Sequence, residues 1–240
     1  ARMMGALSHD PKVAKEYFQK AVDLGDKSAA IAMYYVDEGW YADKTEVIEQ
    51  IAELAKSGDM QANLFLSQTL TGSDAIPYLT KVAESGDFVS MVNLARYYGD
   101  NALYSKTSLK EALNWYNKLI ERFPNDATAY REKAWLLYND LGVRGEVMPA
   151  IFSDLNRAIE LHPQDSKALM HLAKIYQIDA QHGDAAQALA LYQQIIALNN
   201  DDVDSTQARL QQAMLLKYGD GNVVKDETAA HALFEEIIEK

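Results

Sequence analysis

AIFSDLNRAIELHPQD, at residues 150–165, is one of seven similar stretches that decide the fold. The others are VAKEYFQKAVDLGD (13–26), EVIEQIAELAKSGD (46–59), AIPYLTKVAESGD (75–87), EALNWYNKLIERFPND (111–126), ALALYQQIIALNNDD (188–202) and HALFEEIIEK (231–240). Each carries a large apolar residue at the same register: Phe18, Ile51, Leu79, Tyr116, Leu155, Tyr192 and Phe234. These residues lie 28 to 42 positions apart, and a period of roughly 20 to 50 residues is typical of stacked repeats.

The repeats predict an all-α fold, because one helix-turn-helix cannot bury its own apolar face and must stack on its neighbours. We expect a right-handed α-solenoid of about seven stacked helix-turn-helix repeats, forming a single repeat domain over residues 1–240. The expected repeats are a partial one at 1–26, then 27–59, 60–87, 88–126, 127–165, 166–202 and 203–240. Since the first helix of the first repeat is nearly absent, we interpret the chain as a truncated piece and expect some self-association.

Local signals support the same division. Asp10-Pro11 is a helix start, with an N-cap followed by proline in the first turn. The Gly-Asp pairs at 25–26, 58–59 and 86–87 each end a helix, because glycine accepts the left-handed conformation. Residues 99–107 and 139–146 are the longest irregular stretches, which makes them candidate binding loops. Small residues on the first helices allow close helix packing: Ala32, Ala95, Ala134, Ala173 and Ala213.

Composition limits the function classes. The net charge is −12, and the sequence contains no cluster of Lys and Arg that could contact the phosphates of a nucleic acid. We therefore expect no nucleic-acid partner. No apolar run reaches the roughly 18 residues of a membrane span, and the chain does not open on a signal peptide. Cysteine is absent, which fits the periplasm and leaves the cytoplasm open.

No motif predicts catalysis, a metal or a cofactor. The histidines at 9, 162, 171, 182 and 231 form no metal-binding pair, and we interpret those at 162 and 182 as solvated turn residues. Residues 199–204 begin like a calcium loop but lack its glycine and its final glutamate, so helix capping is the better interpretation. Residues 219–222 lack the Lys-Ser/Thr ending of a phosphate loop. We therefore expect a protein that is not an enzyme.

Aromatic and arginine side chains on the first helices are the candidate binding residues, because such residues anchor protein interfaces. The candidates are Arg96, Tyr97, Arg131, Trp135 and His171. In the pairs Tyr34-Tyr35 and Tyr97-Tyr98, neighbouring side chains differ by about 100° around the helix, so one of each pair should be more exposed. Ordinary packing is the alternative interpretation for each residue.

The repeat endings resemble two known families. The Gly-Asp endings of the first three repeats resemble Sel1-like repeats, and the last repeat resembles them most closely, through Tyr218, Gly219, Gly221, Val223 and Lys225. It departs from that pattern in two ways: Tyr218 lies directly beside the first glycine, and one extra residue, Asn222, follows the second. The Phe-Pro-Asn-Asp and His-Pro-Gln-Asp endings at 123–126 and 162–165 resemble tetratricopeptide repeats. The resemblance implies a protein-interaction scaffold.

Residues 94–176 also resemble the periplasmic repeat lipoprotein scaffolds of alginate secretion. The likeness lies in LARYYGDNAL (94–103), WLLYNDLG (135–142), MPAIFSDLNRAIE (148–160) and LAKIY (172–176). It implies an assembly factor for exopolysaccharide export, with an outer-membrane porin and periplasmic polysaccharide-modifying proteins as partners. It also implies periplasmic localisation and an outer-membrane anchor, although the lipid-carrying cysteine is absent here. The alternatives are a generic Sel1-like adaptor in signalling or host interaction, and a carbohydrate-binding solenoid.

Overall fold

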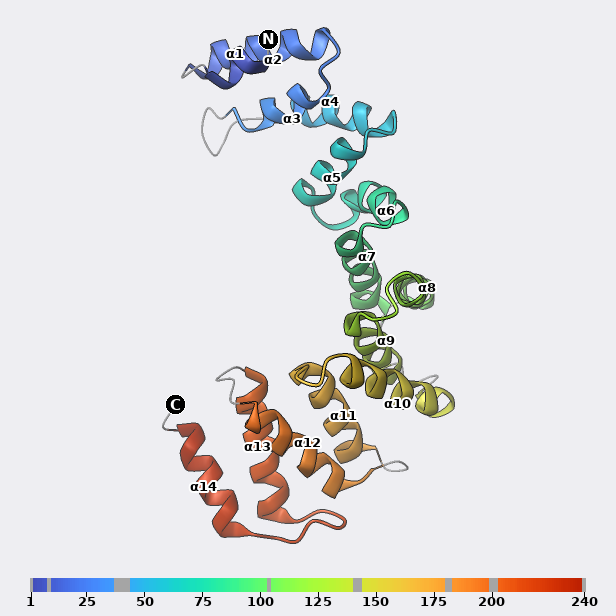
Figure 1. The fold of residues 1–240 in the computed structure, drawn as a ribbon, viewed down its shortest axis with the longest axis vertical. Coiled ribbons are helices and arrows are strands. Elements are labelled where there is room, and N and C mark those ends of the chain that lie inside the picture. Colours follow the sequence, from blue (N-terminus) through green and yellow to red (C-terminus); the bar gives the residue numbers. More distant parts are fainter. Residues whose placement is uncertain are drawn as a thin grey trace. The chain divides into compact units, whose positions relative to one another are not determined.

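The computed structural model describes residues 2–7, 10–36, 44–102, 105–139, 144–179, 183–198 and 203–238. These residues form fourteen α-helices and one short 3-10 helix, and the described part of the chain contains no strand (Figure 1). The helices group into two compact units, Ala1–Asp100 and Asn101–Lys240. The prediction of an all-α repeat fold is therefore confirmed in each unit. The boundary between the units falls inside the expected repeat at 88–126.

In the N-terminal unit (Ala1–Asp100), each helix packs against the next one along the chain. Two apolar clusters fill it, one around Phe18 and one around Ile51 and Leu66. The helices are α1 (Arg2–Leu7), α2 (Pro11–Asp23), α3 (Ser28–Tyr34), α4 (Thr45–Lys56), α5 (Met60–Thr69), η1 (Gly72–Asp74), α6 (Ile76–Glu84) and α7 (Phe88–Asp100).

The Gly-Asp pairs end one helix and, in most cases, begin the next one. Gly25, Gly58 and Gly86 all have φ near 91°, so each ends a helix in the left-handed region that glycine tolerates. The aspartate that follows starts the next helix in two of the three cases. The carboxylate of Asp59 accepts a hydrogen bond of 2.9 Å from the Ala62 amide, and Asp87 accepts one of 2.8 Å from Ser90. The pairs therefore form the short turns between consecutive repeats.

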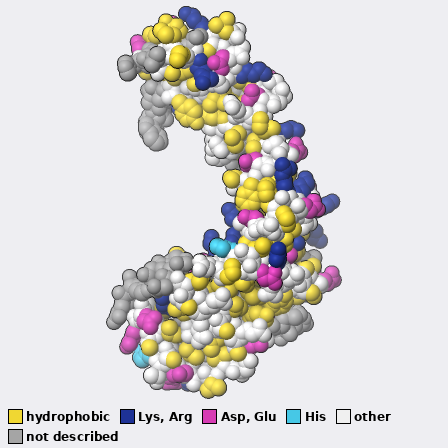
Figure 2. All heavy atoms as spheres, viewed as in Figure 1, with side chains coloured by type: hydrophobic (Ala, Val, Ile, Leu, Met, Phe, Trp, Pro, Cys, Tyr) yellow, Lys and Arg dark blue, Asp and Glu magenta, His cyan; other side chains and the backbone are white. Residues whose placement is uncertain are grey.

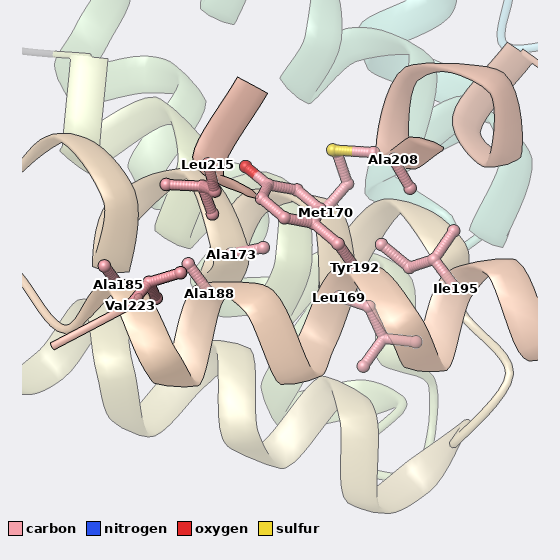
Figure 3. Close-up of a cluster of buried hydrophobic side chains, with 10 residues drawn as sticks. All are labelled: Leu169, Met170, Ala173, Ala185, Ala188, Tyr192, Ile195, Ala208, Leu215 and Val223. Atoms are coloured by element: carbon pink, nitrogen blue, oxygen red, sulfur yellow. The ribbon is translucent and has the colours of Figure 1, made fainter. Parts of the chain in front are cut away.

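The C-terminal unit (Asn101–Lys240) holds α8 (Lys106–Arg122), α9 (Ala127–Asn139), α10 (Arg144–Leu161), α11 (Ser166–Ile178), α12 (Ala185–Ala197), α13 (Val203–Tyr218) and α14 (Glu227–Ile238). Figure 3 shows part of its core, where Tyr192 of α12 lies between Leu169 and Met170 of α11 and Leu215 of α13. The Tyr192 hydroxyl donates a hydrogen bond of 2.5 Å to Oε1 of Gln177. One side chain thus joins two consecutive repeats.

The large apolar residues at the shared register are buried in six of the seven repeats, and Phe234 is the exception. It is half-buried because only α13 packs strongly against α14 within the described residues. Of the first-helix alanines that we expected at close helix contacts, Ala95, Ala134, Ala173 and Ala213 are buried, and Ala32 is only partly buried.

The two expected loops are shorter than predicted. The stretch at 139–146 is partly helical, since α10 already begins at Arg144, and residues 140–143 lie outside the described residues. In the stretch at 99–107, α7 continues to Asp100 and α8 begins at Lys106, with the Ser105 hydroxyl accepting from the Ser108 amide at 3.2 Å. Residues 103 and 104 lie outside the described residues. The candidate binding loops there stay predictions.

Candidate protein-binding face

The first helices of three consecutive repeats, α9, α11 and α13, lie side by side in the C-terminal unit (Figure 1). Two side-chain hydrogen bonds join α11 to α13. Ser166 of α11 donates a hydrogen bond of 2.7 Å to Asp204 of α13, and Gln177 donates one of 3.2 Å to Gln211. We call the surface of these helices the first-helix face. Its residues are Arg131, Trp135, Lys167, His171, Lys174, Gln177, Ile178, Leu210, Gln211, Met214, Lys217 and Tyr218.

An aromatic stack connects α9 to α11. The indole ring of Trp135 lies parallel to the imidazole of His171, with 4.1 Å between ring centroids and 9° between planes. Tyr138 stacks on the same indole at 5.7 Å. The ammonium of Lys174 lies 6.0 Å from the Trp135 ring, at the outer limit of a cation–π contact. Trp135 is half-buried, so part of this platform faces solvent.

His171 is kept neutral by its surroundings. The pKa of His171 is lowered to about 4, mainly by burial; the negative charges of Glu132 and Asp165 raise it, and the positive charges of Arg131 and Lys174 lower it. Its Nδ1 atom is buried and has no hydrogen-bond partner among the described residues. At neutral pH the ring is therefore an uncharged stacking partner rather than a cationic one.

The side chain of Arg131 is engaged in ion pairs within the protein. Its guanidinium donates to Asp165 at 2.5 Å and to Glu132 at 3.0 Å, and the side chains of Arg131 and Asp165 are only 11% and 6% exposed. Burial opposes the charge of Arg131, but the hydrogen bonds and charges of Glu132 and Asp165 outweigh it and raise its pKa. Asp165 also caps α11 through the Ala168 amide at 3.1 Å. This placement makes Arg131 a connection between α9 and the start of α11.

The outer side of α13 carries apolar residues that our sequence reasoning missed. Leu210, Met214 and Tyr218 are spaced by four residues and share one helix face. They are 38%, 39% and 64% exposed, and Ile178 at the end of α11 is 68% exposed. The four-residue spacing itself could have revealed this stripe in the sequence.

The remaining candidates, Arg96 and Tyr97, belong to α7 in the N-terminal unit. Arg96 is exposed, and Tyr97 is half-buried in an edge contact with Tyr98, 5.5 Å between centroids. Tyr98 is half-buried as well, so neither ring of this pair stands out. In the other pair Tyr35 is 69% exposed while Tyr34 packs against Phe65, as predicted. Within the C-terminal unit, the structure thus brings together Arg131, Trp135 and His171.

The features that our sequence analysis set aside behave as structural elements where they can be described. His162 is exposed in a turn, as expected, and the histidines at 9 and 182 lie outside the described residues, as do residues 199–202 of the calcium-like stretch. Residues 219–222 connect α13 to α14, and Asn222 accepts a hydrogen bond of 3.0 Å from the Ala186 amide at the start of α12.

Across the described ranges, no cluster of His, Asp and Glu could hold a metal ion. Within those ranges, too, every helix is too short or too polar to cross a membrane.

The sequence family that matches the chain is the Sel1 repeat, over residues 2–26, 89–122 and 208–240. The first and last segments agree with our expectation of Sel1-like repeats. The middle one ends at residue 122, directly before the Phe-Pro-Asn-Asp ending at 123–126 that resembles a tetratricopeptide repeat. Comparison with curated proteins finds no match.

Solved structures match almost the whole chain. The crystal structure of c5321, a protective antigen of uropathogenic Escherichia coli strains with an SLR fold, is 21% identical, with TM-score 0.54, covering 98% of this chain and 52% of that one. A Sel1 repeat protein from Oxalobacter formigenes is 19% identical, with TM-score 0.52, covering 95% and 94%. Human IFIT1, in a dimer with PPP-AAAA, is 13% identical, with TM-score 0.54, covering 95% and 55%. The chain thus spans about half the length of c5321 and of IFIT1.

These matches confirm the α-solenoid class that the repeats predict. Sel1 and tetratricopeptide repeat folds generally serve as non-catalytic scaffolds that bind other proteins, because stacked repeats create extended binding surfaces.

Proposed function

We propose that this chain is a non-enzymatic protein-interaction scaffold that acts in the bacterial periplasm as an assembly factor for exopolysaccharide export. The observation that carries the scaffold role is the first-helix face. It combines the half-buried Trp135–His171 platform with exposed apolar and basic side chains on α11 and α13. Aromatic anchors inside a mixed polar surface are typical of protein interfaces.

The export role rests on the resemblance of residues 94–176 to the scaffolds of alginate secretion. That stretch runs from α7 into α11 and includes Trp135 and His171, so the resemblance and the candidate face overlap. Under this proposal the partners are an outer-membrane porin and periplasmic polysaccharide-modifying proteins. The chain would reach the outer membrane through a lipidated segment that precedes it.

The experiment is affinity capture from a bacterial cell-envelope extract on the immobilised chain, with mass spectrometry of the retained material. We expect an outer-membrane porin or a polysaccharide-modifying protein to be retained above a column carrying an unrelated helical protein. Retention of cytoplasmic or host proteins alone would replace the proposal with a generic adaptor. Retention of polysaccharide without protein would replace it with a carbohydrate-binding solenoid.

A further inference from the structure

Charge on the C-terminal unit is distributed unevenly among its helices. The chain as a whole has 35 acidic and 23 basic side chains. Yet α11 (Ser166–Ile178) contains Lys167 and Lys174 and no carboxylate, and α13 (Val203–Tyr218) contains Arg209, Lys217 and a single carboxylate, Asp204. Figure 2 shows acidic side chains over α14 (Glu227–Ile238), whose sequence contains three glutamates and no Lys or Arg. Helices α11 and α13 thus contain more basic than acidic side chains, unlike the chain as a whole.

The lysines of this face remain available to a partner. Lys167 and Lys217 are exposed and Lys174 is half-buried, and none of the three forms an ion pair within the described part of the chain. Lys174 instead lies beside Trp135, and Lys217 lies 5.3 Å from the ring of Tyr218 and 5.8 Å from that of Phe234 on α14. The pKa of the Glu227 carboxyl group is lowered, mainly by its hydrogen bond with Lys225 and also by the charge of Lys217. Arg209 differs, because it is buried and lies 3.6 Å from Glu236.

Apolar residues share the face with these lysines. On α13, Leu210, Met214 and Lys217 follow the seven-residue spacing of one helix side, and Tyr218 extends it. On α11, Lys167, His171, Lys174 and Ile178 follow the same spacing. The hydrogen bond between Gln177 and Gln211 holds the two rows next to each other. A partner that covers both rows meets apolar side chains flanked by positive charge.

We propose that the rows on α11 and α13 bind an acidic amphipathic segment of a partner protein. Such a segment places its apolar side on Leu210, Met214 and Ile178, and its carboxylates on Lys174 and Lys217. A helical ligand suits such a surface, because an amphipathic helix can lay its apolar side on the exposed apolar residues and keep its charged side chains at the edges. A polysaccharide is disfavoured because its small C–H faces suit aromatic rings, whereas most of the exposed apolar area here belongs to the aliphatic side chains of Leu210, Met214 and Ile178. The proposal rests on the scaffold function and names the partner class.

The test uses the full chain and four fluorescent probes, followed by fluorescence anisotropy. Three are peptides: a Glu-rich helix with leucines on one side, the same helix with Lys in place of Glu, and an acidic scramble with the leucines dispersed. The fourth is a polyuronate oligosaccharide. We expect the acidic amphipathic peptide to bind at least tenfold more tightly than the other three. Equal binding of the basic or scrambled peptide, or preferential binding of the polyuronate, would overturn the proposal.

Three variants assign the binding to these rows. Lys174→Glu and Met214→Gln should each weaken the acidic peptide about tenfold. Lys110→Glu makes the same charge change on α8, whose exposed side carries lysines without an apolar row, and it should leave binding unchanged. Circular dichroism and thermal melting establish that each variant is folded. Equal losses for Lys110→Glu and Lys174→Glu would show charge attraction without a site, and the proposal would fall.

The two proposals fail separately. If the chain captures envelope proteins and the Lys174→Glu and Met214→Gln variants retain them equally well, the scaffold role stands and this site falls. If the chain forms a dimer that Lys174→Glu dissolves, as light scattering would reveal, the occupant is a second copy and the proposed partner class is wrong.

Discussion

The indole of Trp135 and the imidazole of His171 lie 4.1 Å apart and nearly parallel, and they join helices from two consecutive repeats. Aromatic stacking of this kind contributes about 1 kcal/mol beyond the apolar area that it buries. We expect Trp135→Ala and His171→Ala to destabilise the C-terminal unit, with a coupling energy of about 1 kcal/mol in a double-mutant cycle of urea unfolding. Strictly additive effects would mean that the stack is only contact without stabilising interaction.

Burial of the His171 imidazole should make the C-terminal unit sensitive to acid. The pKa of His171 is about 4 in the folded protein and about 6.5 when unfolded, so the unfolded chain binds more protons between these values. Its contribution to stability is fully present above pH 6.5 and is lost as the pH falls toward 4, by up to roughly 3 kcal/mol.

Chemical unfolding between pH 4 and 7 checks this dependence. His171→Phe keeps an aromatic ring and cannot titrate, so its stability should change less over that range than that of the wild type. His162→Gln, at an exposed turn, is the control and should follow the wild type. A wild-type slope that survives in His171→Phe would place the pH dependence elsewhere.

The ion pair between Arg131 and Asp165 should be one of the costliest to break. Arg131→Met leaves the 6%-exposed carboxylate of Asp165 without its charged partner, which typically costs about 3 to 5 kcal/mol. Thermal unfolding would measure the loss, and Arg131→Met combined with Asp165→Asn should recover part of it while keeping the α11 cap. Lys56→Ala, which removes an exposed ion pair with Glu53 on α4, should change little. A similar result for both single variants would contradict the structural role of Arg131.

Substitutions of Tyr192 test whether each repeat is stabilised mainly by contacts with its adjacent repeats. Tyr192→Ala removes a fully buried ring and should cost about 3 to 5 kcal/mol, whereas Tyr192→Phe removes only the hydrogen bond to Gln177 and should cost about 1 kcal/mol. Tyr116→Ala should behave like Tyr192→Ala at its own repeat. Hydrogen exchange should accelerate first in α11, α12 and α13 for the Tyr192 variant. Uniform acceleration along the whole chain would show that the repeats do not unfold locally.

The helices and their pairing could be predicted from the sequence because the signals are local. The apolar register of residues such as Ile51 and Leu155, and the Gly-Asp pairs, depend on spacing within one or two turns of helix. The start of α10 at Arg144 could not be predicted, since glycine at 145 and proline at 149 both disfavour a helix interior.

The candidate site was predicted only in part for a related reason. Aromatic and arginine side chains on first helices identified Trp135, His171 and Arg131, but the sequence could not show that Arg131 would pair with Asp165, 34 residues away. Lys174 and Met214 are individually unremarkable residues. They stand out only when α11 and α13 lie next to each other. Likewise, Asn222 looked like an insertion, and its bond to the start of α12 depends on tertiary contact.

The central claim is that this chain binds proteins through the first-helix face of its C-terminal unit. The most direct test is quantitative capture from a cell-envelope extract with three forms of the chain: the wild type, the double variant Lys174→Glu/Met214→Gln, and Lys110→Glu. We predict that a defined set of envelope proteins is retained equally by the wild type and Lys110→Glu, and at least tenfold less by the double variant. Equal retention by all three forms, or no specific retention by any, would contradict the claim.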